Sequence, residues 1–297
     1  MTRFHHKEHA NKQSRELFVE ASIEASEAVD NGFNFNEIDA LYLGYFSSDM
    51  FEKQAHTSAL MADWLGINPK PTARIETACA SSGVAINMGI MGIASGLYDV
   101  ILVGGVEKMR TLNTGEVTDT LAMAADANFE VASGFTFPGL YAAMASAHFK
   151  EHGTSWEELA HITIKNHDNG ALNPKAQYQD TIMNIAKKLG ERKEMNFCDE
   201  LEFLNSSLNP MIASPLKLFD CCPISDGAAV VILSSIEKAK EFTDSPVQVL
   251  GLGQASDTMA LHDREDLTSL KATKIASRQA YNMAGISPED VSFACVH

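Results

Sequence analysis

The sequence predicts an α/β protein in which helices cover both faces of a sheet. Two short, wholly apolar segments, at 100–103 and 230–233, are typical of strands that are buried on both faces. Strands and helices alternate between residues 12 and 103, which indicates the layered packing of the α/β class. A third observation is an internal repeat close to the two ends of the chain, which predicts a fold built from two similar halves.

Composition excludes several classes of protein. The 297 residues, 45% hydrophobic and 21% charged, are ordinary for a globular protein of one large α/β unit or two domains. A net charge of −16 argues against binding to nucleic acid or to an anionic membrane surface. Five cysteines without metal-site spacing indicate a reduced, cytoplasmic protein, and no segment resembles a secretory signal or a membrane span.

The elements of the first part follow from apolar spacing. Apolar residues at three- and four-residue steps predict a helix over about 12–31, with Gly32 as its stop signal. The next elements expected, in chain order, are a strand at 38–46, a helix at about 53–65, a strand at 73–77, a helix at 80–96 and the strand at 100–103. Small residues dominate the helix at 80–96, so it can pack closely on its neighbours.

The texture changes between about 110 and 221, where charged and aromatic residues mix and helices are expected at 138–151 and 155–169. We call residues 111–221 the lid. The α/β pattern resumes at 224–234 and continues with a strand at 247–252, a helix at about 269–284 and a last strand at 290–296. The predicted units are residues 1–110, the lid at 111–221, a return to the first unit at 222–244 and the start of a second half at 245–297.

The repeat consists of a helix, a glycine, four residues, an acidic residue and an apolar strand. Residues 21–43, with Gly32 and Glu37, align without a gap to residues 274–296, with Gly285 and Asp290. A strand precedes the second copy but not the first, and the first copy continues further along the chain than the second. The repeat therefore predicts a chain that lacks its first strand and most of its second half.

Cys79 is the strongest candidate for chemistry. It stands between a predicted strand and the N-terminus of the helix at 80–96, where unpaired backbone N–H groups and the helix dipole favour a thiolate and lower the pKa. The small residues around it let a substrate carbonyl approach the backbone, whose N–H groups can stabilise an oxyanion. A buried structural cysteine is the alternative, and position by itself leaves both open.

Two motifs carry a family resemblance: Glu-Thr-Ala-Cys-Ala-Ser-Ser-Gly at 76–83 and Gly-Gly-Val-Glu-Lys-Met at 104–109. They resemble the nucleophile region and the following strand end of thiolases. Further matching segments, in the same order as in that family, are 153–160, 165–167, 173–174, 225–229 and the closing Val296-His297. Residues 257–258 and 261–264 are similar to the archaeal branch, and the closing pair is similar to the sterol-carrier-type and archaeal thiolases.

The resemblance implies a thiolase fold, a five-layered αβαβα sandwich of two pseudo-duplicated halves with an inserted helical lid, here with an incomplete second half. It implies an acetyl-CoA C-acetyltransferase (acetoacetyl-CoA thiolase), in which the Cys79 thiolate accepts the acyl group and His297 is an oxyanion donor. His148 and Ser214 would contact the substrate. The family's acid/base cysteine and activating histidine would fall beyond residue 297, so we expect the chain to be truncated at both ends and inactive alone.

The resemblance also implies partners. Coenzyme A is expected as substrate and product, with no cofactor and no bound metal. A homodimer or tetramer is expected, pairing through the sheet edge near 99–109. HMG-CoA synthase and a zinc-containing bridging protein with an OB fold are further expected partners, in a cytoplasmic mevalonate pathway, with no nucleic acid and no membrane.

Other candidates are weaker. His5, His6 and His9 could bind a metal, although a flexible exposed tail is the better interpretation. His148 and His152 lie at i and i+4 of one predicted helix, with no third ligand evident. Basic residues for the phosphates of coenzyme A could be Lys187, Lys188, Arg192 or Lys193. Two rival functions stay open: a ketoacyl-synthase-like condensing enzyme and a non-catalytic scaffold subunit of the same fold.

Overall fold

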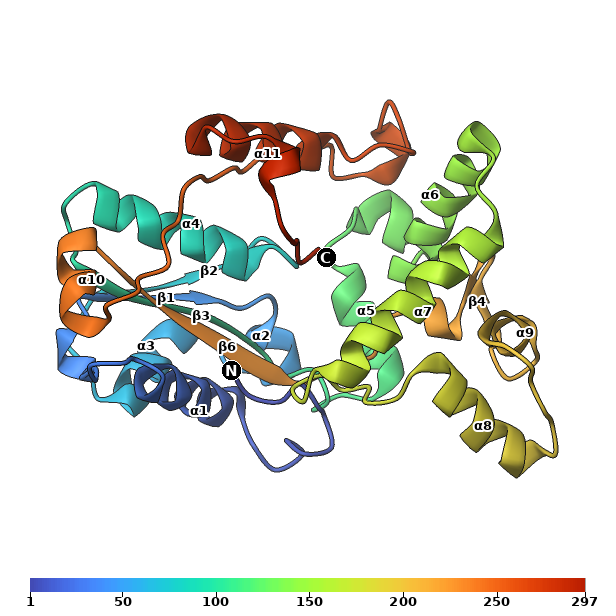
Figure 1. Ribbon diagram of the computed structural model, residues 1–297, viewed down its shortest axis with the longest axis horizontal. Coiled ribbons are helices and arrows are strands. Elements are labelled where there is room, and N and C mark those ends of the chain that lie inside the picture. Colours follow the sequence, from blue (N-terminus) through green and yellow to red (C-terminus); the bar gives the residue numbers. More distant parts are fainter. Residues whose placement is uncertain (297) are drawn as a thin grey trace.

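A mixed four-stranded sheet organises the part of the chain that the computed structural model describes, residues 1–296. The strands stand in the order β2 (Thr72–Ile75), β1 (Ala40–Gly44), β3 (Val100–Glu107) and β6 (Gly227–Ser234) (Figure 1). β1 is parallel to β2 and to β3, whereas β6 runs antiparallel to β3. The apolar segments at 100–103 and 230–233 are therefore neighbouring strands, as expected for a buried sheet.

Helices cover both faces of this sheet, which confirms the predicted α/β class. α1 (Ser14–Glu27) and α3 (Thr57–Leu65) pack on one face, with Leu17 and Phe18 buried against alternate strand residues such as Leu102 (Figure 1). α4 (Ser81–Ala94) covers the other face, over Ile101 and its neighbours. Successive strand residues point to opposite faces, so one apolar strand fills both layers.

The lid contains mostly helices and has an apolar cluster of its own. Its elements are α5 (Thr114–Ala122), α6 (Phe137–His152), α7 (Trp156–Leu172), α8 (Ile182–Lys193), α9 (Glu200–Asn205) and the hairpin β4 (Met211–Ala213) with β5 (Leu216–Lys217). Ala160, Ile182 and Phe203 are fully buried where α7, α8 and α9 meet. The helices predicted at 138–151 and 155–169 are confirmed as α6 and α7.

Two helix boundaries differ from the predictions. The helix expected to run to residue 31 ends at Glu27, and a turn precedes Gly32, whose φ is 85°. The helix expected from residue 53 begins at Thr57, after the short helix α2 (Ser48–Phe51). His56 takes the left-handed conformation with φ of 58°, which breaks the helical path before Thr57.

The N-terminal residues are folded, so the expectation of a flexible exposed tail is wrong. The Thr2 backbone N–H donates to the Ala228 carbonyl at 3.0 Å, and the Ala228 N–H donates to Thr2 Oγ1 at 3.0 Å. Thr2 and His9 are both buried. The start of the chain thus lies along the beginning of β6, because these backbone groups complete each other's hydrogen bonds.

The strand predicted at 247–252 is wrong, whereas the following helix is confirmed as α11 (Lys271–Ala284). Residues 247–252, which follow α10 (Ile236–Phe242), are extended but pair with no strand among residues 1–296. They lie between α4 and α11, since Gln254 accepts from Asn87 of α4 and its N–H donates to Gln279 of α11. The layer order is therefore helix, sheet, helix, extended segment, helix, but the fourth layer has no ladder (Figure 1).

The last predicted strand, 290–296, is also wrong, for the same reason: residues 291–296 find no ladder partner in the described chain. The local structure of the repeat is nevertheless the same in both copies. The 3₁₀ turns Phe35–Glu37 and Pro288–Asp290 differ by 253 positions, each has a capping box, and each follows a glycine of positive φ. The repeated sequence thus encodes the same turn twice, and only the first copy leads into a paired strand.

The expected pairing of protomers through the edge near 99–109 does not fit the sheet. β3 occupies that segment and is hydrogen-bonded on both sides, to β1 and to β6. A strand with both edges satisfied cannot pair with another chain. None of the helices in residues 1–296 is both long and apolar enough to cross a membrane.

Candidate active site

Cys79 lies directly before α4, in a turn that joins β2 to this helix. The Thr77 N–H donates to Ser81 Oγ at 3.0 Å, and Ser81 Oγ donates to the Ala78 carbonyl at 2.6 Å. Ala78 has a positive φ of 49°, an unusual conformation for a residue with a Cβ. This sharp turn leaves the Cys79 side chain exposed at the helix N-terminus, as the sequence predicts.

Two glycines of the sheet allow α4 to begin so close to it. A Cβ on Gly44 of β1 would lie 2.5 Å from the Ser82 backbone nitrogen, and a Cβ on Gly105 of β3 would overlap Ser82 Oγ. Ser82 therefore rests against bare backbone of two neighbouring strands. This close approach fixes where the first turn of α4 starts, and with it the position of Cys79 three residues earlier.

The expected lowering of the Cys79 pKa is not what the surroundings produce. Burial by neighbouring atoms raises the pKa of the thiol, and the groups of Cys222 and Glu107 raise it further, whereas its own backbone N–H acts in the opposite direction. Desolvation and nearby acidic groups thus outweigh the helix N-terminus. Within residues 1–296, the thiol has no cationic partner, so a base must act on it before it attacks a substrate.

Glu107 is an unusual carboxyl group beside this site. It ends β3 and accepts hydrogen bonds from the backbone N–H groups of Phe46 (3.1 Å) and Ser47 (3.3 Å). Burial raises the pKa of Glu107 to about 7, although both N–H groups and Arg74 act to lower it. Arg74 holds the same loop from its other side, donating to the carbonyls of Tyr45 and Phe46.

Two groups near Cys79 were missed by the sequence analysis. Cys222, at the end of the lid, and Tyr141, in α6, both lie within electrostatic range of Cys79, and burial raises the pKa of the Tyr141 phenol. They are far from Cys79 in sequence, and neither stands in a motif, so no local signal identifies them. Glu107 does stand in the quoted Gly-Gly-Val-Glu motif, which could have drawn attention to it.

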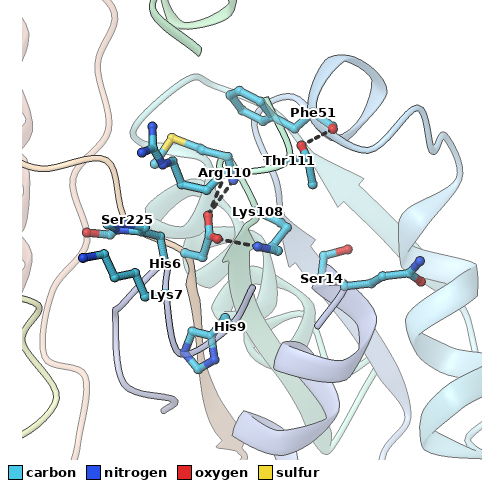
Figure 2. A network of polar contacts seen from close by, with 12 residues as sticks. His6, Lys7, His9, Ser14, Phe51, Lys108, Arg110, Thr111 and Ser225 are labelled. Atoms are coloured by element: carbon cyan, nitrogen blue, oxygen red, sulfur yellow. Dashed lines mark hydrogen bonds and ion pairs between the residues drawn. The ribbon is translucent and has the colours of Figure 1, made fainter. Parts of the chain in front are cut away.

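The two ends of the lid meet at one buried carboxylate. Asp226 accepts hydrogen bonds from Lys108 Nζ, from the Met109 N–H at 2.8 Å and from the Arg110 N–H at 3.1 Å (Figure 2). Residues 108–110 lead from β3 into the lid, and Asp226 leads from the lid into β6. The quoted Ser-Asp-Gly-Ala-Ala motif thus closes the junction between the lid and the sheet.

The other predicted site residues do not gather around Cys79. His148 lies near the C-terminal end of α6, where its Nδ1 is 2.8 Å from Thr154 Oγ1 and its ring stacks on His152. Ser214 is exposed in the turn between β4 and β5. The neighbouring Ile212 and Ala213 line a cavity of about 390 Å³ with residues 133–136, Pro138 and Gly139. His297 lies outside the described residues.

No group of three or more metal-binding side chains occurs in the described part of the chain. His5 and His6 stack on each other, and His6 is hydrogen-bonded to Gln177. His9 Nε2 is hydrogen-bonded to the Arg3 carbonyl. These histidines therefore take part in packing the N-terminal residues.

Comparison with known proteins agrees with this architecture. Residues 1–237 match the family model described as thiolase, N-terminal domain, and residues 253–297 match the thiolase C-terminal domain-like model. The chain is 42% identical to the acetyl-CoA acetyltransferases of Methanothermobacter thermautotrophicus and Methanocaldococcus jannaschii, over 95% of its length and 68% and 67% of theirs.

Among solved structures, the Ltp2-ChsH2(DUF35) aldolase superposes with a TM-score of 0.75 over 98% of this chain and 69% of that one, at 21% identity. This likeness shows the fold. The archaeal relatives and the two family models show the family, which confirms the resemblance drawn from the Cys79 and Gly-Gly motifs. The chain has the thiolase fold and belongs to the thiolase family of acyltransferases.

Proposed function

We propose that this protein is an acetyl-CoA C-acetyltransferase in which Cys79 is the acyl-accepting nucleophile. The observation that carries the proposal is the exposed thiol at the N-terminus of α4, held against the sheet by Gly44 and Gly105. The two archaeal relatives with that name support acetyl-CoA as the substrate. Coenzyme A is then a substrate and product, and no cofactor takes part.

The first half of the reaction transfers an acetyl group to the thiol. The Cys79 sulfur attacks the thioester carbonyl, the bond from that carbon to the coenzyme A sulfur breaks, and coenzyme A leaves with the proton that Cys79 gave up. The negative charge on the carbonyl oxygen needs hydrogen-bond donors, and the Cys79 backbone N–H is close to where that charge forms. In the second half, the enolate of another acetyl-CoA attacks the acyl-cysteine; the reverse is thiolysis of acetoacetyl-CoA.

Residues 1–297 alone are expected to turn over slowly or not at all. Deprotonation of Cys79 and of the second acetyl-CoA each requires a base, and the raised pKa of Cys79 makes the first requirement stricter. No side chain in residues 1–296 makes a hydrogen bond to the thiol. His297, as an oxyanion donor, and His148 and Ser214, as substrate contacts, remain part of this proposal.

Mass spectrometry after incubation with acetyl-CoA tests the nucleophile. We expect an acetyl adduct on Cys79 that is absent from Cys79→Ser and unchanged in Cys198→Ser, a variant of another exposed cysteine. Equal labelling of all five cysteines would refute the proposal. An acetylated Cys79 that coenzyme A fails to discharge would favour the condensing-enzyme or scaffold alternative over thiolysis.

We also propose that the protein is a homodimer or tetramer in the cytoplasm, acting in the mevalonate pathway, and that it pairs through β2 rather than near 99–109. β2 is hydrogen-bonded to β1 on one side, and its other edge is unpaired in the described chain. One similar solved structure is titled as a complex with a DUF35 protein, which supports a zinc-containing OB-fold partner that bridges to HMG-CoA synthase. Size measurement with and without such a partner tests both associations.

A further inference from the structure

Glu130 is a buried carboxylate that joins the lid to the segment 258–264. Its side chain is 7% exposed and accepts hydrogen bonds from the backbone N–H groups of Leu261 and His262, the latter at 3.1 Å. His262 Nδ1 lies 3.2 Å from the same oxygen, and the Phe129 ring packs edge-on against the His262 ring. Burial acts to raise the pKa of Glu130, but these hydrogen bonds and one from Asp126 outweigh it and lower the pKa, so the group is held as a carboxylate.

The segment held by Glu130 carries Arg264 on a short, fixed stem. The Arg264 N–H donates to the Leu261 carbonyl at 3.2 Å, and Nε donates to the Thr258 carbonyl at 3.0 Å. These bonds hold the backbone and the inner nitrogen of the guanidinium. Its two outer nitrogens have no hydrogen-bond partner within residues 1–296, so they are free to bind another group.

Arg264 and Cys79 share a neighbour on the lid. The Tyr141 phenol senses both groups: the Cys79 thiol raises its pKa, and the Arg264 guanidinium opposes this change. The three groups come from the start of α4, from α6 and from the segment 258–264. They therefore surround one region, although more than 180 residues separate Cys79 from Arg264 in the chain.

A fixed guanidinium with two unused donors is suited to an anion. Its planar donors match the oxygen pairs of a carboxylate or a phosphate, and this geometry favours recognition over simple charge balance. In a chain of net charge −16, a cation beside the nucleophile also offsets the repulsion that an anionic substrate meets.

We propose that Arg264 is a specificity-determining residue of the Cys79 site that binds an anionic oxygen group of the acyl-CoA substrate, and that Glu130 is the positioning residue that holds Arg264 there. The inference rests on the proposed acyl transfer at Cys79. The anionic group is either a carboxylate on the acyl chain or a phosphate of coenzyme A.

The charge near Cys79 can be measured without turnover, from the ratio of its alkylation rates with anionic iodoacetate and neutral iodoacetamide. Arg264→Gln should lower this ratio about threefold to tenfold, and Arg264→Lys should largely restore it. Glu130→Gln should lower it in the same direction, because the segment loses its anchor. Arg192→Gln and Glu151→Gln, exposed charges elsewhere on the lid, are the matched controls and should leave the ratio unchanged.

The outcomes separate this inference from the proposed function. An unchanged ratio in Arg264→Gln overturns the role of Arg264, and a lower melting temperature with an unchanged ratio in Glu130→Gln overturns positioning by Glu130. A wild-type Cys79 that reacts no faster than Cys198 would instead count against the proposed nucleophile itself.

Protection of Cys79 from iodoacetamide identifies the source of the anion. If the acyl carboxylate binds, Arg264→Gln weakens protection by succinyl-CoA several-fold more than protection by acetyl-CoA. If the 3′-phosphate binds, the variant weakens protection by acetyl-CoA but not by its 3′-dephospho form. Equal protection of variant and wild type by all three esters would overturn the inference.

Discussion

Lys108 donates to the Asp226 carboxylate in the protein interior, where the two side chains are 3% and 0% exposed. This ion pair links the residue that leaves β3 to the residue that enters β6, across 118 positions of sequence. The same carboxylate accepts two backbone N–H groups of the lid's first residues, so its remaining lone pairs are also used (Figure 2). The lid is therefore fastened to the sheet at a single, fully satisfied charge.

Breaking this pair should destabilise the protein strongly. Lys108→Met leaves the Asp226 charge buried without its partner, and we expect a loss of about 3–5 kcal/mol in the free energy of unfolding, measured by urea titration. Lys188→Met removes a surface pair with Asp180, whose side chains are 62% and 35% exposed, and should cost under about 1 kcal/mol. Similar losses in the two variants would contradict the structural role given to Asp226.

A methyl group at Gly105 should displace the nucleophile. Gly105→Ala places a Cβ on Ser82 Oγ, so we expect a loss of about 1–3 kcal/mol in stability and slower alkylation of Cys79. The double variant Gly105→Ala/Ser82→Gly should recover part of both. Gly83→Ala is the control, since nothing lies within 4 Å of its added Cβ. Normal Cys79 reactivity in Gly105→Ala would show that this contact does not set the site.

Glu107 should make stability fall as the pH rises. Its folded pKa of about 7 lies above the ordinary 4.5, so between these values the folded protein keeps a proton that the unfolded chain has released. The free energy of unfolding therefore decreases across that window, by up to about 3 kcal/mol for this group. Glu107→Gln should lack this part of the slope. Urea titrations below and above the window measure it, and parallel slopes for both proteins would refute the shift.

The same variant should make Cys79 more reactive. Glu107 raises the Cys79 pKa, so its removal lowers that pKa and increases the thiolate fraction at neutral pH. The pH profile of iodoacetamide labelling measures the change. Glu116→Gln, in the first turn of α5, is the control and should leave the profile in place; an identical profile for Glu107→Gln would count against electrostatic coupling.

α11 should detach when the close approach of the extended segment is blocked. A Cβ on Gly253 would overlap the Ala276 carbonyl oxygen of α11, so Gly253→Ala should expose the helix to proteolysis. Val247→Ala, at a residue that is 97% exposed in the same segment, should not. Equal cleavage of the two variants would show that these glycines do not dock α11.

Local signals identified most elements correctly. The apolar runs gave β3 and β6 directly, and the spacing of apolar residues gave α1, α4, α6, α7 and α11. The strands at 247–252 and 290–296 failed because a strand exists only with a hydrogen-bonded neighbour, and apolar spacing carries no information about whether that neighbour is present. The order of the sheet, which places β3 in its interior and leaves an edge of β2 unpaired, likewise depends on long-range pairing.

By itself, the sequence determined the α/β class, the repeated turn and the nucleophile candidate Cys79, because short motifs and periodic patterns are written in neighbouring residues. The tertiary structure alone decided the electrostatics of that site. Glu107, Tyr141, Cys222 and Arg264 approach Cys79 from four separate parts of the chain, and their burial and charge raise the pKa that the helix N-terminus by itself would lower. A pKa depends on every group within several ångströms, and only folding brings these groups together.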